Sequence, residues 1–155
     1  MQESKPKARR IIGIDFGMAR LGLAYSDESK TIASPLAVIQ AEKKSEQTVS
    51  KVVKELKQHE QQFNYEIEEI VVGLPLLMSG KVGLLADEVK HFVELLKKSI
   101  QAPVVTWDER LTTVQAERSM RETSLTRKRR SKVIDTVAAV IILQNYLDHK
   151  KMMSQ

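Results

Sequence analysis

The order of the apolar segments constrains the fold of this chain more than any other feature. Three short apolar runs come first, at residues 11–15, 21–25 and 32–39, separated only by short turns. Runs of this length bounded by turn residues are typical of buried strands. Because short turns join them, we expect the three strands to be antiparallel. Pro35 interrupts the third run and indicates an edge strand, where a missing backbone donor is tolerated.

The following segment alternates helical and strand patterns. It predicts a helix from Ser45, a strand at residues 69–74, a second helix, and a fifth strand at residues 103–107. The expected buried faces consist of Val49, Val52, Val53, Leu56 and Phe63 in the first helix, and Val82, Leu85, Val89, Phe92, Val93 and Leu96 in the second. Strands that are reached through a helix are normally parallel, so the fourth and fifth strands should be parallel.

The last part of the chain contains the longest apolar helix pattern. Thr112 and Gln115 have the spacing of a capping box and predict a short helix. Residues 120–130 are polar and charged and predict a mobile loop, whereas residues 132–146 predict a helix that packs across the sheet. This order of elements resembles the ribonuclease-H-like fold, an α/β architecture with a mixed five-stranded sheet and helices on both faces.

Length and composition indicate one domain without disulfides. The chain has 155 residues, 42% of them hydrophobic and none of them cysteine, which excludes a disulfide framework and a thiolate zinc site. No apolar run approaches the roughly 20 residues that span a bilayer, and the N-terminus lacks the apolar segment of a secretion signal. We expect a cytoplasmic protein with a basic disordered tail (residues 1–10), a domain (residues 11–148) and a flexible tail (residues 149–155).

Three acidic residues on different segments are candidate metal ligands. Asp15 ends the first apolar run, Glu109 follows the fifth strand, and Asp135 shares a helical face with Ala139 and Tyr146. A carboxylate in an apolar layer is costly unless it is paired or bound to a cation. If the three converge, they form an oxygen-lined site suited to magnesium or manganese.

Each acid also has a structural interpretation. Asp15 could satisfy amides of a tight turn, Glu109 could pair with a surface arginine, and Asp135 could complement a helix dipole. Asp108 could be a further ligand. However, adjacent strand residues face opposite sides of a sheet, so we favour Glu109 over Asp108.

The net charge of +5 is unevenly distributed. The densest basic run precedes the last helix and consists of Arg127, Lys128, Arg129, Arg130 and Lys132. Such a run is either a solvated loop or a contact for a polyanion. Its proximity to candidate carboxylates favours nucleic acid, because cations offset the repulsion between those acids and phosphate. Arg20 and Arg110 could also contact phosphate or could pair structurally.

Several motifs resemble one protein family. They are Ile-Gly-Ile-Asp-Phe-Gly at residues 12–17, Val-Gly-Leu-Pro-Leu at 72–76, Asp-Glu-Arg-Leu-Thr-Thr at 108–113, and the basic run followed by Ile-Asp and Ala-Ala-Val-Ile-Ile-Leu-Gln at 138–144. Together they resemble the YqgF family of Holliday-junction resolvases and pre-16S rRNA nucleases, which are related to RuvC. The resemblance implies phosphodiester hydrolysis by metal-activated water, with the catalytic acids falling on Asp15, Glu109 and Asp135. In one loop, Leu77 and Ser79-Gly80 replace the asparagine and Asp-Gly usual in the family.

These observations predict a magnesium-dependent endonuclease that acts on structured nucleic acid. The substrate could be a four-way DNA junction or precursor rRNA, and a homodimer is implied only by the junction, which needs two symmetric cuts. One alternative is a non-catalytic RNA-binding module of the same fold. Another is an actin-like nucleotide-binding fragment, although 155 residues leave no room for a second lobe.

Overall fold

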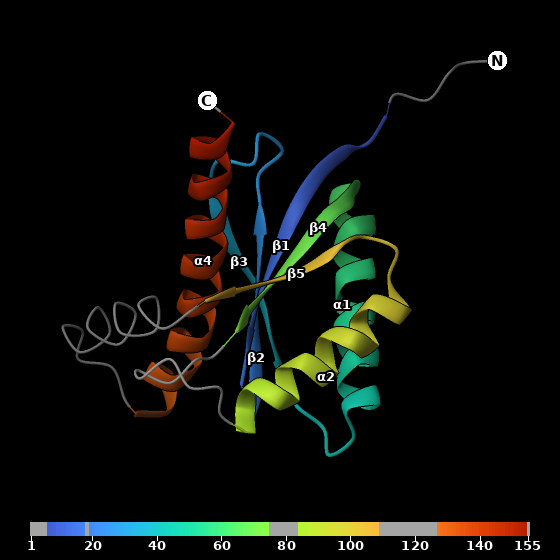
Figure 1. Ribbon diagram of the computed structural model, residues 1–155, viewed down its shortest axis with the longest axis vertical. Helices are drawn as coiled ribbons and strands as arrows, with labels where there is room; N and C mark the ends of the chain where they lie inside the picture. Colours follow the sequence, from blue (N-terminus) through green and yellow to red (C-terminus); the bar gives the residue numbers. More distant parts are fainter. Residues whose placement is uncertain (1–5, 18, 75–83, 109–126, 155) are drawn as a thin grey trace.

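The protein is built around one mixed sheet with helices on both faces (Figure 1). The computed structural model describes residues 6–17, 19–74, 84–108 and 127–154. Its elements are β1 (Ala8–Phe16), β2 (Arg20–Ser26), β3 (Ala33–Gln40), α1 (Ser45–Phe63), β4 (Tyr65–Leu74), α2 (Leu84–Ser99), β5 (Val104–Asp108) and α4 (Arg127–Met153). Among the described helices, none combines the length and apolarity that a membrane span requires.

The sheet has the topology that the sequence predicts. Its five strands lie in the order β3-β2-β1-β4-β5. The pairs β1·β2 and β2·β3 are antiparallel, and the pairs β1·β4 and β4·β5 are parallel. Pro35 lies on the edge strand β3, opposite Ala24 and next to an irregularity in the register, which is a position where proline is tolerated.

Alternation along β1 divides the apolar residues between two cores. Ile12 and Ile14 are fully buried in the core that α1 and α2 cover. Ile11 belongs to the second core, which α4 covers, and the backbone of Gly13 lies against α4 on the same face. A Cβ atom at Gly13 would lie 2.8 Å from Leu143 Cβ and 3.3 Å from the Ala139 carbonyl oxygen. The missing side chain therefore allows α4 to cross β1 at close range.

Residues 8–10 and 149–153 belong to regular secondary structure, in contrast to the sequence prediction. β1 begins at Ala8 because Ala8 pairs with Tyr65, and Arg10 lies over the rings of Tyr25 and Tyr65 at 5.6 and 5.2 Å. The prediction of a disordered tail through residue 10 is therefore wrong for residues 8–10. The flexible tail predicted from His149 is also wrong, since α4 continues to Met153.

Two further sequence predictions require correction. α4 begins at Arg127, so residues 127–130 are helical and do not belong to a loop. Arginine and lysine are good helix formers, and polarity alone is a poor sign of a loop. Phe63 is 46% exposed at the end of α1, although its spacing placed it on the buried face. The predictions for Thr112, for residues 120–126 and for the loop of Leu77 and Ser79 lie outside the described residues.

Candidate functional site

The C-terminal ends of three adjacent strands meet in register at one end of the sheet. Asp15 of β1 lies opposite Gly73 of β4, and Gly73 lies opposite Trp107 of β5. Neighbouring strands are about 4.8 Å apart, so the backbones of Asp15 and Trp107 are separated by roughly 10 Å. Ligand sites of α/β sheets form at the carboxyl ends of parallel strands, which makes this end of the sheet the candidate site.

Asp15 lies on the sheet face that α4 covers. Ile11 packs in the α4 core and Gly13 faces Leu143, so the two-residue period places Asp15 on the same side. On the opposite side, the Phe16 ring contacts that of Phe92 of α2, with the ring centroids 5.1 Å apart and the planes tilted by 49°. The Asp15 residue is half-buried.

Both lateral neighbours of Asp15 are glycines. The antiparallel partner in β2 is Gly22, and the parallel partner in β4 is Gly73. Neither neighbour has a side chain that could occupy the space beside the Asp15 carboxylate. Small lateral neighbours are compatible with a hydrated divalent cation at this position, because magnesium keeps several of its waters.

Arg20 lies at the same end and on the same face. Leu21 and Leu23 belong to the core under α1 and α2, whereas Ala24 belongs to the α4 core, so Arg20 shares the α4 side by alternation. Since Asp15 pairs with Gly22, Arg20 is its diagonal neighbour, at a distance of roughly 7–8 Å. The structure thus brings together one predicted ligand and one predicted phosphate contact.

α4 leads the predicted third acid toward this end of the sheet. In Figure 1, α4 runs antiparallel to β1, so its N-terminal half lies near the C-terminal end of β1. Ala139 lies against Gly13, and position 135 is one helical turn before Ala139 in α4. Because α4 and β1 run in opposite directions, this earlier turn of α4 lies toward Asp15. The Asp135 side chain lies outside the described residues.

The remaining predicted site residues have no described side chains. Glu109 and Arg110 directly follow the last described residue of β5. The basic residues Arg127, Lys128, Arg129, Arg130 and Lys132 have a described backbone only, in the first turns of α4. In the described part of the chain, no group of three or more histidine, aspartate or glutamate residues is positioned to hold a metal ion. Convergence of Asp15, Glu109 and Asp135 stays a prediction.

Sequence reasoning missed an aromatic cluster beside this site. Trp107 contacts Tyr146 edge-on at 5.4 Å between ring centroids and lies 5.2 Å from the His149 ring. The Tyr146 hydroxyl donates to Glu69 Oε1 at 2.8 Å, and burial together with this carboxylate raises the pKa of Tyr146. A usable signal was present, since Trp107 is two residues before Glu109, and Tyr146 is on the helical face predicted for Asp135.

The sequence is similar to those of bacterial proteins along nearly its whole length. The chain is 62% identical over 148 residues to a protein of Protochlamydia amoebophila (strain UWE25) named "Putative pre-16S rRNA nuclease", covering 96% of this chain and 99% of that protein. A protein of the same name from Halothermothrix orenii is 43% identical over 141 residues, covering 91% of this chain and 96% of its own length.

Structural similarity supports the same fold. Thermus thermophilus RuvC in complex with a Holliday junction substrate matches with a TM-score of 0.53 and 14% identity, covering 92% of this chain and 96% of RuvC. The fold is therefore ribonuclease-H-like, as the sequence predicts. The model of the RuvX family, described as "Holliday junction resolvase", matches residues 9–149. With this match across nearly the whole chain, the protein belongs to the RuvX family of Holliday junction resolvases.

Proposed function

We propose that this protein is a divalent-metal-dependent endonuclease whose site is formed by Asp15, Glu109 and Asp135. The observation that carries the proposal is the position of Asp15 at the end of β1, between two glycines and on the face that α4 covers. Membership of the RuvX family supports a hydrolase that acts on phosphodiester bonds.

The alternation of β5 supports Glu109 over Asp108 as the second ligand. Val105 and Trp107 pack against the α4 core, whereas Val104 belongs to the core under α1 and α2. If this two-residue period continues beyond Trp107, position 109 falls on the face of Asp15 and position 108 on the opposite face. The third ligand, Asp135, is supported by its position one turn before Ala139 in α4.

The donor set suits magnesium or manganese, because both ions prefer hard oxygen ligands. When bound, such an ion would lower the pKa of an attacking water and neutralise charge on the leaving oxygen. In this proposal the chain orients the ion through carboxylates from three segments. Arg20, Arg110 and the basic run at 127–132 hold the substrate phosphates.

Precursor rRNA is the favoured substrate. The most similar of the relatives described above carries the name of a pre-16S rRNA nuclease and covers nearly all of this chain. The family description instead names Holliday junctions, and cleavage of a junction would require a homodimer with two symmetric sites. Either substrate agrees with a cytoplasmic location.

Cleavage of end-labelled RNA that spans a precursor 16S terminus, compared with a four-way DNA junction, tests the proposal. With magnesium or manganese we expect discrete RNA products, and with EDTA we expect none. If only the four-way junction is cleaved into discrete products, the substrate is junction DNA and not precursor rRNA. Tight binding without cleavage of either substrate under any metal condition would identify a non-catalytic binding module and refute the nuclease assignment.

Neutralising the basic run should weaken binding and flatten its salt dependence. Replacing Arg127, Lys128, Arg129 and Arg130 with glutamine removes four positive charges near the proposed site. Each lost phosphate contact should reduce the slope of log K against log salt by about 0.7 for single strands and about 0.9 for duplex DNA. The measurement is fluorescence anisotropy of a labelled RNA at several salt concentrations, with EDTA present.

The matched control removes the same charge from the opposite face of the sheet. Lys54 and Lys57 of α1 and Lys97 and Lys98 of α2 are exposed there, and their replacement by glutamine should leave the slope nearly unchanged. If the wild type and the variant with glutamine at positions 127–130 have equal slopes, the basic run does not contact the phosphates.

A further inference from the structure

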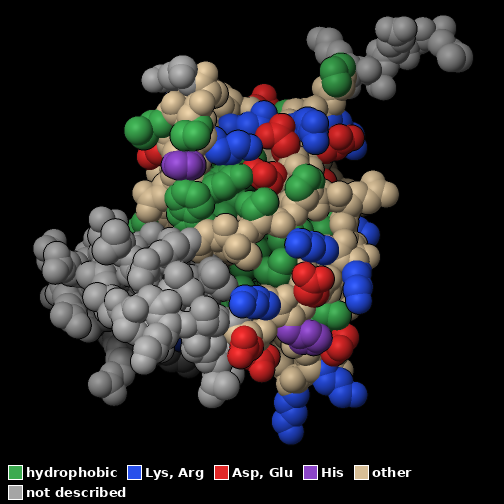
Figure 2. Space-filling view, viewed as in Figure 1, with side chains coloured by type: hydrophobic (Ala, Val, Ile, Leu, Met, Phe, Trp, Pro, Cys, Tyr) green, Lys and Arg blue, Asp and Glu red, His purple; other side chains and the backbone are tan. Residues whose placement is uncertain are grey.

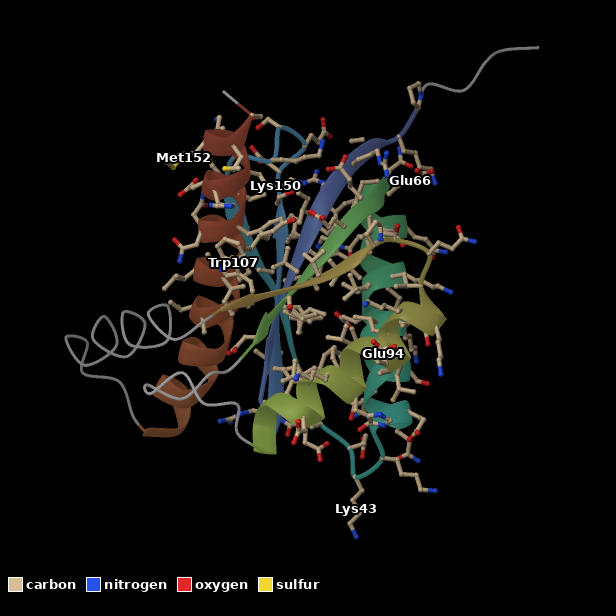
Figure 3. All side chains as sticks on the ribbon, in the orientation of Figure 1. Lys43, Glu66, Glu94, Trp107, Lys150 and Met152 are labelled. Carbon is tan, nitrogen blue, oxygen red and sulfur yellow. The ribbon has the colours of Figure 1, made fainter. Side chains whose placement is uncertain are left out.

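A groove lies between the edge strand β5 and the C-terminal half of α4. Its volume is about 450 Å³, and it is lined mainly by Val105, Trp107, Tyr146, His149, Lys150 and Met153. We call it the Trp107 groove. Figure 2 shows hydrophobic side chains gathered on this face, bordered by charged side chains of both signs. Figure 3 shows Trp107 and Lys150 on the same side of the sheet, beside α4.

The aromatic walls of the groove are held in place. Tyr146 meets the Trp107 ring at an interplanar angle of 87°, and its hydroxyl donates to Glu69 of β4. The same carboxylate accepts from Lys150 Nζ at 3.1 Å, which keeps this ammonium at the groove. Trp107 is only partly buried, and His149 is exposed, so their rings are accessible from solvent. The groove is thus a preorganised aromatic surface with a cation at its border.

The groove begins beside the proposed catalytic site. Trp107 is two strands from Asp15, in register and on the same face, at a backbone separation of roughly 10 Å. From Tyr146 to Met153 the groove follows about two turns of α4, or roughly 10 Å. Stacked nucleotides rise by about 3.4 Å each, so this length accommodates about three of them. A strand whose phosphate lies at Asp15 can therefore place nearby bases against Trp107.

We propose that the Trp107 groove binds unpaired bases of the nucleic-acid substrate next to the cleaved phosphate. Unpaired bases expose flat faces that stack on aromatic side chains, whereas bases within a duplex hide those faces against each other. The Lys150 side chain is half-exposed at the border of the groove, so its ammonium can contact a neighbouring phosphate in addition to Glu69. The inference rests on the proposed nuclease function and deepens it, because it assigns a preference for substrates with a single-stranded segment at the cleavage site.

The competing occupant is another protein strand. Among the described strands, β5 lies at the edge of the sheet, and a second copy of the chain could pair with it there. The aromatic rings and the alignment with Asp15 favour nucleic acid, and the experiment distinguishes the two.

Trp107 is the only tryptophan of the chain, so its fluorescence reports directly on the groove. The probes are a short labelled oligouridine and a blunt RNA duplex, added with EDTA so that no cleavage occurs. We expect the oligouridine to quench the fluorescence of Trp107 by stacking, with the same midpoint as the anisotropy of the label. The blunt duplex should cause little quenching at concentrations at which it binds.

Three variants test the contribution of the ring. Trp107→Leu should weaken oligouridine binding roughly 5- to 150-fold, the loss expected for one stacked base, whereas Trp107→Phe should retain most of the affinity. His149→Ala changes an exposed residue and leaves the fluorescent ring in place, and it should weaken binding less than Trp107→Leu. The control is Phe63→Leu, since Phe63 is also exposed and contacts a histidine ring, that of His59 at 4.5 Å, but belongs to α1. Its binding should equal that of the wild type.

The outcomes separate this inference from the proposed function. If oligouridine binds without changing the fluorescence of Trp107, the inference is wrong, whether or not the protein cleaves RNA. If it quenches Trp107 but no substrate is cleaved with metal, the groove assignment stands and the nuclease proposal fails. A concentration-dependent dimer that Trp107→Leu dissociates would assign the groove to a second copy and overturn the inference.

Discussion

Asp15→Asn is expected to reduce RNA cleavage by at least roughly a thousandfold while the protein remains folded. Metal-assisted stabilisation of the transition state contributes several kcal/mol, and each 1.36 kcal/mol corresponds to about a factor of ten in rate. Asparagine has the same size but lacks the charge that binds the cation, so the space between Gly22 and Gly73 is preserved. Single-turnover rates at saturating magnesium and thermal melting of the same sample provide the two measurements.

Asp27 provides a matched control, because it is an acid that follows a strand and satisfies a turn. Its carboxylate accepts from the Thr31 and Ile32 amides at 2.8 and 3.1 Å and from the Ser29 hydroxyl at 2.8 Å. Burial is the largest single effect and opposes ionisation, but the Ile32 and Thr31 amides and the Ser29 hydroxyl together outweigh it and lower the pKa of Asp27. Asp27→Asn should therefore lower stability modestly and leave cleavage unchanged.

The comparison distinguishes two roles for Asp15. If Asp15 only satisfies turn amides, Asp15→Asn should behave like Asp27→Asn, with lower stability and retained cleavage. That result would exclude Asp15 as a metal ligand and contradict the nuclease proposal, which rests mainly on the position of Asp15.

Gly13→Ala is expected to destabilise the protein by about 1–3 kcal/mol, which is typical of overpacking in a core. The added Cβ would lie 2.8 Å from Leu143 Cβ and 3.3 Å from the Ala139 carbonyl oxygen. The Ala139 contact involves backbone, so relief requires α4 to move away from β1. Because α4 also carries Asp135, cleavage should fall further than the loss of stability explains. Urea denaturation and cleavage rates at a temperature where the variant is folded measure both effects.

Ser34→Thr is the control, since it adds one methyl group to a partly exposed position of the edge strand β3. Its effect should remain within about 0.5 kcal/mol. If Gly13→Ala were equally mild, the close crossing of α4 over β1 would not constrain the position of the helix. The contact of Ala139 with Gly13 would then not fix the position of Asp135.

Local patterns were sufficient to predict the sheet. Strand directions follow from the lengths of the connections, and the edge position of Pro35 follows from its missing donor. The same patterns wrongly predict tails or a loop at residues 8–10, 127–130 and 149–153, because these residues are polar but belong to β1 and α4. Contacts distant in sequence stabilise the two termini, such as Arg10 with Tyr65 and Lys150 with Glu69.

The sequence by itself determined the order of the elements, the family and the residue types proposed as ligands, because these depend on periodicity and motifs along the chain. Only the tertiary structure decided which residues are neighbours across the sheet. The register that places Asp15 between Gly22 and Gly73, with Trp107 one strand further, depends on hydrogen bonds between distant strands. The crossing of α4 at Gly13 depends on packing, which no local pattern contains.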